Sequence, residues 1–249
     1  MKTIYLFDVD GTLTEPRKEI DEMFASVFLD WMEECSVDVY LVSGSDIKKI
    51  KQQIFNAFLE RCTGVFCCAA NQLYQGDKLI YENKFRSPKN LIEDLEIYLE
   101  ESQYSFKTGN HIEERPGMIN FSVLGRNANM LQREQYTKWD KGVREREDIV
   151  EYVTSNYPEL DASIGGATSV DIYLRGRDKS QVVEYLKKQY QEGISIVFVG
   201  DKNIPGGDDY PLAMVLEKDP NSHWVQVECY EETRALIEYS KLFNMENGI

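Results

Sequence analysis

Short apolar runs alternate with longer amphipathic stretches at both ends of the chain. The apolar runs have the length of β-strands and lie at 4–7, 37–42, 65–69, 194–199 and 224–227. Helical periodicity fills the intervals, over 18–35, 45–61, 179–191 and from residue 231 onward. Strands that alternate with helices favour a parallel sheet with helices packed on it. The pattern therefore predicts an α/β fold whose Rossmann-like, parallel-sheet core is built from both ends of the chain.

The middle of the chain has a different pattern. It predicts helices and strands that lie, in order, at 87–101 (helix), 118–123 (strand), 144–156 (helix) and 167–174 (strand). In the last strand apolar and polar residues alternate, which is typical of a sheet with one buried and one open face. We therefore expect an inserted α+β cap domain with an exposed sheet face, placed as a lid over an active site. The expected boundaries are core at 1–84 and 181–249 and cap at 85–180.

The composition argues against nucleic acid and membranes as partners and indicates the cellular compartment. The 249 residues carry a formal charge of −15, which argues against nucleic acid or a membrane surface as a partner, because phosphate groups attract clustered Lys and Arg. No stretch has the roughly 18 to 20 apolar residues of a membrane span, and residue 2 leads into the first strand rather than a signal peptide. Five cysteines without a Cys-x-x-Cys pair, and only two histidines, favour neither disulfides nor zinc. We expect a cytoplasmic protein.

Two acidic residues directly follow the first strand. Asp8 and Asp10 are two positions apart, so they point to the same side of an extended chain, and Gly11 allows a turn that makes room for a phosphate. Taken alone, Asp-x-Asp after a strand is most often an Asx-type turn. The alternative is a phosphoryl-transfer centre, with Asp8 as the nucleophile and Asp10 as the acid/base that carries a proton.

Polar residues also follow two further predicted strands. Ser43 and Ser45 follow the second strand, and Asp201 follows the most apolar one. Ligands of an open parallel sheet collect at the carboxyl ends of its strands, so these groups are expected beside Asp8 and Asp10. Mg²⁺ prefers oxygen ligands and suits such a cluster. It would remove the repulsion between a carboxylate and a phosphate, which is about 4 kcal/mol per unit-charge pair at about 4 Å.

Two residue types near these strand ends could hold the transferred phosphate. Ser43 or Ser45 could donate hydrogen bonds to its oxygens, and Lys179 could add a positive charge. Each also has an ordinary interpretation, Ser43 as a helix N-cap and Lys179 as a solvated surface lysine. The two interpretations differ in whether the side chain lies beside the carboxylates.

Together these motifs resemble the haloacid dehalogenase superfamily and, within it, the eukaryotic-type phosphomannomutases. The similarity extends from residue 5 to about residue 232. It rests on the segments 6–17 (LFDVDGTLTEPR), 44–46 (GSD), 115–120 (RPGMIN), 125–126 (GR), 169–171 (SVD), 176–179 (GRDK), 200–202 (GDK) and 205–210 (PGGDDY). The first and last segments mark the superfamily, and the arginine-containing middle ones are specific to the family.

The resemblance implies a Mg²⁺-dependent mutase that interconverts mannose 6-phosphate and mannose 1-phosphate through an aspartyl-phosphate, with hexose 1,6-bisphosphate as intermediate and activator. Matching positions imply Asp8, Asp10 and Lys179 as catalytic residues, and Asp8, the Asp10 carbonyl and Asp201 as Mg²⁺ ligands. The implied substrate-binding residues are Arg17, Ser45, Arg115, Arg126, Arg133, Ser169 and Asp171. The resemblance also implies a cytoplasmic homodimer that associates through its caps.

The distribution of arginine supports a mutase independently of the resemblance. Seven of the 11 arginines lie between Arg115 and Arg177, although the protein is acidic. A mutase holds one phosphate at Asp8 and the other in the lid, so it needs a second anion site, whereas a phosphatase does not. Two alternatives stay open. One is a sugar-phosphate phosphatase, in which water discharges the aspartyl-phosphate, and the other is a non-catalytic sugar-phosphate sensor, although the expected catalytic residues are all present.

Several positions depart from the family's usual pattern. Arg177 replaces a usual Trp, Val170 a usual Phe and Ser43 a usual Gly. Asp219 begins a segment that resembles the family's second cation loop, but an Asp-Pro pair is also typical of a surface turn. These departures bear on the fit of the sugar and on a second cation site.

Overall fold

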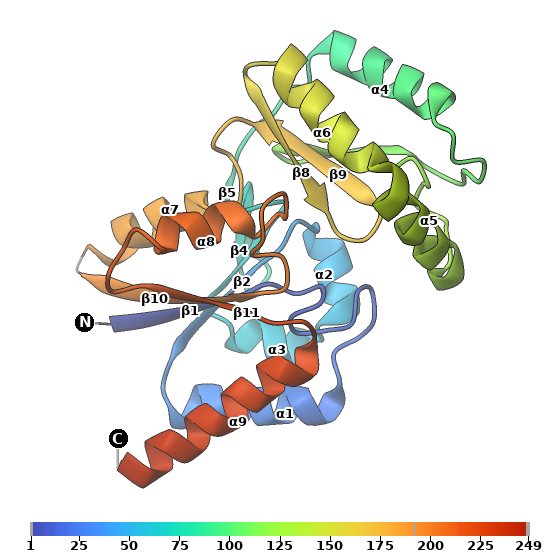
Figure 1. The fold of residues 1–249 in the computed structure, drawn as a ribbon. Helices are drawn as coiled ribbons and strands as arrows, with labels where there is room; N and C mark the ends of the chain where they lie inside the picture. Colours follow the sequence, from blue (N-terminus) through green and yellow to red (C-terminus); the bar gives the residue numbers. More distant parts are fainter. Residues whose placement is uncertain (1, 192, 248–249) are drawn as a thin grey trace.

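The computed structural model describes residues 2–191 and 193–247, and the side chains of 2–191 and 193–240. Its strands form a seven-stranded sheet and a separate four-stranded sheet. The two ends of the chain share the larger sheet, and the middle of the chain supplies the smaller one, which lies to one side with its helices (Figure 1). The predicted fold class, a parallel-sheet α/β core with an inserted α+β unit, is confirmed.

The larger sheet is parallel through most of its width. Its strands are β1 (Lys2–Phe7), β2 (Asp38–Val42), β3 (Gly64–Cys67), β4 (Gln72–Gln75), β5 (Lys78–Glu82), β10 (Ile194–Gly200) and β11 (His223–Gln226). Their order is β11-β10-β1-β2-β3-β4-β5, and the pairs β3–β4 and β4–β5 are antiparallel whereas the others are parallel. Because β1 lies between β10 and β2, the strand that precedes Asp8 is near the centre of the sheet.

Helices cover both faces of this sheet (Figure 1). One face packs against α1 (Glu22–Glu34), α2 (Ile47–Gln53), α3 (Asn56–Arg61) and α9 (Tyr230–Asn247), and the other against α7 (Gln181–Tyr190) and α8 (Tyr210–Leu216). Burial on both faces explains why β1 and β10 are almost continuous apolar runs. The single helix predicted over 45–61 is two helices, because Ile54 is extended between α2 and α3. Among the described residues no helix has both the length and the apolar character needed to cross a membrane.

The smaller sheet carries its helices on one face only. Its strands are β6 (Ile112–Arg115), β7 (Met118–Phe121), β8 (Leu160–Gly165) and β9 (Ser169–Leu174), and the antiparallel order is β6-β7-β9-β8. The helices are α4 (Lys89–Glu101), α5 (Met130–Val143) and α6 (Glu145–Asn156). Ile119 of β7 and Ile172 of β9 pack against them in an apolar cluster with Leu91, Tyr136 and Val153.

The opposite face of the smaller sheet is polar, and the prediction that it is exposed was wrong. Ser169, Asp171 and Tyr173 of β9 are all buried. Tyr173 and Met118 belong to the same apolar cluster as core residues such as Cys68, so this face lies against the core domain. The alternation along β9 correctly separates the two faces of the sheet. It carries no information about a distant part of the chain that covers the polar face.

The chain passes between core and cap twice, and both crossings are bonded to Asn71. This residue follows residues 68–70, which have φ of 52°, 54° and 65°. Asn71 Nδ2 donates to the carbonyl of Arg177 on the second crossing at 3.2 Å. Its Oδ1 and its carbonyl accept from the side chain and the backbone N–H of Asn83 on the first crossing, at 3.2 and 2.7 Å. A Cβ on Gly117 of the cap would lie 2.3 Å from Asn71, so glycine permits this close approach.

Candidate active site

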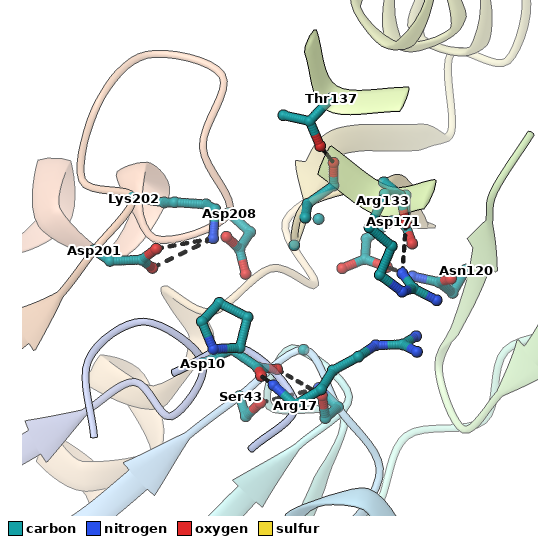
Figure 2. A pocket seen from close by; sticks show the side chains of 18 of the residues that line it. Asp10, Arg17, Ser43, Asn120, Arg133, Thr137, Asp171, Asp201, Lys202 and Asp208 are labelled. Carbon is teal, nitrogen blue, oxygen red and sulfur yellow. Dashed lines mark hydrogen bonds and ion pairs between the residues drawn. The ribbon is translucent and has the colours of Figure 1, made fainter. Parts of the chain in front are cut away.

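A cavity of about 520 Å³ lies between the carboxyl edge of the core sheet and the polar face of the cap sheet (Figure 2). All the predicted site residues except Lys179 line it: Asp8, Asp10, Arg17, Ser45 and Asp201 from the core, and Arg115, Arg126, Arg133, Ser169 and Asp171 from the cap. In Figure 2, Asp201, Lys202 and Asp208 face Asp171, Asn120 and Arg133 across this space, and Arg17 extends into it. The structure therefore brings the predicted groups together in one place.

The central strand β1 delivers Asp8 to this cavity. The backbone N–H of Asp8 donates to the carbonyl of Val199 at 3.0 Å, which continues the pairing of β1 with β10 beyond the strand. Gly11 then turns the chain with φ of +94°, and a Cβ there would lie 2.5 Å from Oδ2 of Asp201. Glycine at this turn therefore lets the carboxylates that follow β1 and β10 approach each other.

Lys179 is the cation of the buried carboxylate centre. Its side chain is 1% exposed, so the interpretation as a solvated lysine was wrong. The Nζ atom lies 2.8 Å from Asp8 Oδ1, 2.9 Å from Asp208 Oδ2 and 2.6 Å from Asp209 Oδ1. Burial lowers the pKa of Lys179, but these three carboxylates raise it well above its ordinary value. Burial raises the pKa of Asp8, and the charge of Lys179 opposes that rise only in part.

Three carboxylates form a candidate metal centre. Asp8, Asp201 and Asp209 each offer an oxygen, and these oxygens lie within 4.8 Å of one another. Burial raises the pKa of Asp201 to about 6, against the lowering effect of Lys202, which lies 3.0 Å away. Crowded carboxylates of this kind suit a hard cation such as Mg²⁺. The resemblance implied Asp8 and Asp201 as metal ligands, and Asp209 lies in the segment 205–210 that carried the resemblance.

Asp10 has its own set of partners. Its carboxylate pairs with Lys49 and accepts from Gln53 Nε2 and from the backbone N–H of Arg17, both at 2.9 Å. Burial raises the pKa of Asp10, but the charge and hydrogen bond of Lys49 and the other two donors bring it down to about 2. Asp10 is therefore held as a carboxylate, the form that accepts a proton.

The loop after β2 places Ser45 beside Asp10. Ser45 Oγ accepts from Lys49 Nζ at 2.9 Å and lies 3.5 Å from Asp10 Oδ2. Ser43 is not the helix N-cap, as one interpretation held, because Asp46 caps α2 by accepting from the backbone N–H of Lys49. Ser43 Oγ instead accepts from the backbone N–H of Ser45 at 3.1 Å. Sequence reasoning missed Lys49, because the tertiary structure brings it to Asp10 from 39 residues away in the sequence.

Two cap arginines share one counter-ion. Arg115 and Arg126 both pair with the carboxylate of Glu113, a residue that the sequence did not single out. Arg115 Nη1 also donates to the carbonyl of Gly44 at 2.9 Å, and Gly44 belongs to the core loop after β2. One predicted phosphate-binding residue of the cap thus already contacts the core.

Arg133 donates its hydrogen bonds to other residues of the cap. Its guanidinium donates to the carbonyls of Ala128 and Arg126, at 3.1 and 3.3 Å, and to Oγ1 of Thr168 at 2.9 Å. Burial and the nearby charge of Arg17 lower the pKa of Arg133 to about 10. Arg133 lines the cavity, but most of its donors hold cap loops together.

A row of polar side chains crosses the cap sheet above the core. Glu113, Asn120, Asp171 and Ser163 are register partners across β6, β7, β9 and β8, so they lie on one face. Asn120 Nδ2 donates to Asp171 Oδ1 at 2.5 Å. Burial raises the pKa of Asp171 to about 6, although Arg115 opposes the rise. Asn120 was missed even though it lies in a segment that carried the resemblance.

Apart from Arg133, the residues of α5 that line the cavity were not predicted, because the sequence pattern did not predict this helix: Met130, Glu134, Thr137, Lys138 and Lys141. Asp219, the candidate for a second cation loop, lies 3.0 Å from Lys187 and accepts from the backbone N–H of Asn221 at 3.1 Å. This geometry is that of an Asx turn with a surface ion pair.

Comparison with known proteins decides the family. A family model described as eukaryotic phosphomannomutase matches residues 27–243. The chain belongs to the eukaryotic phosphomannomutase family. A phosphomannomutase from Spinacia oleracea is 36% identical over 222 residues, which cover 84% of this chain and 85% of that protein. A probable phosphomannomutase from Caenorhabditis elegans is 31% identical over 250 residues, which cover 95% of this chain and 94% of that protein.

Solved structures agree at the level of the fold. A sugar phosphatase of subclass IIB of the haloacid dehalogenase superfamily has a TM-score of 0.54 at 11% identity, over 86% of this chain and 84% of that chain. Trehalose-6-phosphate phosphatase from Aspergillus fumigatus has a TM-score of 0.53 at 18% identity, over 96% of this chain and 92% of that chain. The expected phosphomannomutase family is confirmed, and with it the expectation of a phosphomannomutase-type enzyme.

Proposed function

We propose that the protein interconverts mannose 6-phosphate and mannose 1-phosphate through an aspartyl-phosphate at Asp8, with Mg²⁺ and hexose 1,6-bisphosphate. The observation that carries the proposal is that one cavity joins Asp8 and the candidate metal centre in the core to Arg115 and Arg126 in the cap. A sugar with a phosphate at each end has a partner for both. Membership of the phosphomannomutase family supports the same reaction.

The first proposed half-reaction transfers the phosphoryl group from Asp8 to the sugar and forms the bisphosphate. The free hydroxyl of a hexose monophosphate attacks the phosphoryl group on Asp8, the new bond to the sugar oxygen forms, and the bond to the Asp8 oxygen breaks. Asp10, which Lys49 and the other donors keep in the carboxylate form, takes the hydroxyl proton. After the bisphosphate has turned round, the reverse half-reaction moves the other phosphoryl group to Asp8, and Asp10 returns its proton to the departing oxygen.

The residues present fit a divalent cation. The oxygens of Asp8, Asp201 and Asp209 lie within 4.8 Å of one another, and carboxylate oxygens are the ligands that Mg²⁺ prefers. Mg²⁺ held there, with the Asp10 carbonyl as a further proposed ligand, would offset the repulsion between Asp8 and a phosphate. Lys179 alone faces three carboxylates, so its single charge does not neutralise the centre.

The proposal also covers the subunit count and the cellular compartment. We propose that the protein forms a homodimer through its cap and acts in the cytoplasm. Large apolar side chains exposed on the cap helices, Ile97 of α4 and Leu131 of α5, support association there. Size-exclusion chromatography with light scattering tests the subunit count directly.

Phosphorus NMR tests the reaction. The protein is incubated with mannose 1-phosphate, Mg²⁺ and a catalytic amount of hexose 1,6-bisphosphate, and we expect the signal of mannose 6-phosphate to grow at the expense of the substrate. Release of inorganic phosphate without mannose 6-phosphate would contradict the mutase and favour a sugar-phosphate phosphatase. The same experiment with glucose 1-phosphate measures the preference between the two sugars.

A further inference from the structure

We infer that Glu113 is a positioning residue of the distal anion site: its carboxylate holds Arg115 and Arg126 side by side and keeps Arg115 against the catalytic loop. The inference rests on the proposed function, because it concerns the phosphate that remains in the cap. Glu113 Oε2 accepts from Arg115 Nε at 3.0 Å and pairs with Nη2 of both arginines. One oxygen atom therefore bridges two guanidinium groups.

The strand geometry explains how one carboxylate reaches both arginines. Glu113 and Arg115 are two positions apart on β6, so their side chains lie on the same face of the cap sheet. Arg126 comes from the loop that follows β7, which pairs with β6. Two guanidinium groups at this spacing repel each other, and the repulsion is strong where they are partly buried. Glu113 supplies the negative charge that allows them to remain adjacent when no phosphate is bound.

Glu113 supports the arginines without taking the place of the ligand. Arg115 and Arg126 line the cavity, whereas Glu113 is not among the residues that line it. Within the described part of the chain, the side chain of Arg126 donates a hydrogen bond only through Nη2. Its Nε and Nη1 are therefore left to bind an anion in the cavity. The carboxylate orients the guanidinium, and the guanidinium faces the substrate.

The same carboxylate links the distal site to the core. Arg115, held by Glu113 through Nε and Nη2, uses Nη1 to reach the carbonyl of Gly44 at 2.9 Å. Gly44 precedes Ser45, whose hydroxyl lies in the hydrogen-bonded group around Asp10. The orientation that Glu113 imposes on Arg115 thus also sets the contact between cap and catalytic loop. Both the geometry of the distal site and the contact between the cap and the catalytic loop therefore depend on the side chain of Glu113.

Substitution of Glu113 has a matched control on the same strand. In Glu113→Gln we expect the KM for the hexose phosphate to rise about tenfold, because two arginines lose a fixed orientation, while kcat changes little. Glu114→Gln removes the same charge from the next residue, which is exposed and lies on the opposite face of β6, and we expect wild-type kinetics. Glu113→Asp retains the charge and is expected to recover part of the lost affinity. Melting temperatures establish that all three variants fold.

The outcomes separate this inference from the proposed function. An unchanged KM in Glu113→Gln would overturn the inference, and so would a lower KM, which would mean that Glu113 competes with the phosphate. A loss of kcat alone, with an unchanged KM, would also overturn it, because the substitution would then act at the reacting atoms. Calorimetric titration with hexose 1-phosphate measures the same contacts without turnover. It therefore decides the role of Glu113 even if the NMR experiment shows a phosphatase.

Discussion

The two proposed phosphate sites of the cavity differ in how deeply their charged groups are buried. At the core site, Lys179 and Asp209 are almost completely buried, and each charge is paired with groups at the ends of parallel strands or in the loops that follow them. At the cap site, the side chain of Arg126 is 20% exposed and Glu113 is 35% exposed. Groups that make and break bonds benefit from a fixed environment without water. A site proposed to bind and release a phosphate needs access, and here one of its arginines, Arg115, also contacts the core at the carbonyl of Gly44.

The largest expected effect is at the nucleophile. Asp8→Asn keeps the shape of the side chain but removes the attacking oxygen, so we expect turnover to fall by about 10⁴-fold or more. The substitution removes one of several crowded buried carboxylates, so we expect the folded structure to be retained. The NMR assay measures turnover, and circular dichroism measures folding. Substantial remaining activity in a folded variant would remove Asp8 as nucleophile.

The next effect tests whether the core site depends on its buried cation. Lys179→Met leaves three carboxylates without their shared partner, and breaking a buried ion pair costs about 3–5 kcal/mol of unfolding free energy. Urea denaturation without metal measures the loss, and added Mg²⁺ should recover part of it. Lys188→Met, at an exposed position on α7, is the control and should change stability by less than about 0.5 kcal/mol. Equal stability of the two variants would contradict the assigned role.

A smaller effect on binding is expected in the cap. Arg126→Gln removes charged donors that face the cavity, so we expect the KM for hexose phosphate to rise by about 10- to 100-fold while kcat stays near its original value. Arg175→Gln, on the cap surface and outside the cavity, is the matched control. Steady-state kinetics distinguish the two sites. A loss in kcat alone would place Arg126 at the chemical step and erase the contrast between the two sites.

The pH dependence of stability gives a further comparison. Burial raises the pKa of Asp171 from 3.8 to about 6, so the native state holds this proton more tightly than the unfolded chain does. The carboxyl therefore lowers stability as the pH rises through that window, by about 2–3 kcal/mol. Asp171→Asn cannot titrate there. Urea denaturation at pH 4 and pH 7 should show a larger decline for the wild type than for the variant, and identical declines would contradict the buried, charged Asp171.

The sequence predicted the parts of the fold whose pattern depends on local burial. The strands β1 and β10 are covered on both faces and are therefore continuous apolar runs. The antiparallel strands β4 and β5 were missed because β4 has only four residues and β5, the edge strand, is mostly exposed. The helix α5 was missed because it is largely polar, although a capping box at Asn129 and Gln132 marks its start.

The residues of the candidate site also divide into those that a local sequence pattern could predict and those that it could not. Asp8 and Asp201 could be predicted because each directly follows an apolar strand, and strand ends collect ligands in this class of fold. Lys49 and Glu113 could not, because their importance arises from partners brought near by the tertiary structure. Lys49 meets Asp10 across 39 residues of sequence, and Glu113 meets Arg126 across 13. A charged residue on a helix or an edge strand is ordinarily a surface residue, and no local pattern distinguishes these two.

The bonds of Asn71 to both crossings have a mechanical consequence. A domain attached through two independent linkers can slide, twist or tilt, and each movement changes the site differently. Here Asn83 on one crossing and Arg177 on the other are bonded to the same residue. Both crossings are therefore bonded to one core residue, and we expect the cap to move mainly by changing its angle about that residue. Such a movement would change the distance between Asp8 in the core and Arg126 in the cap, and the proposed bisphosphate would have to span that distance.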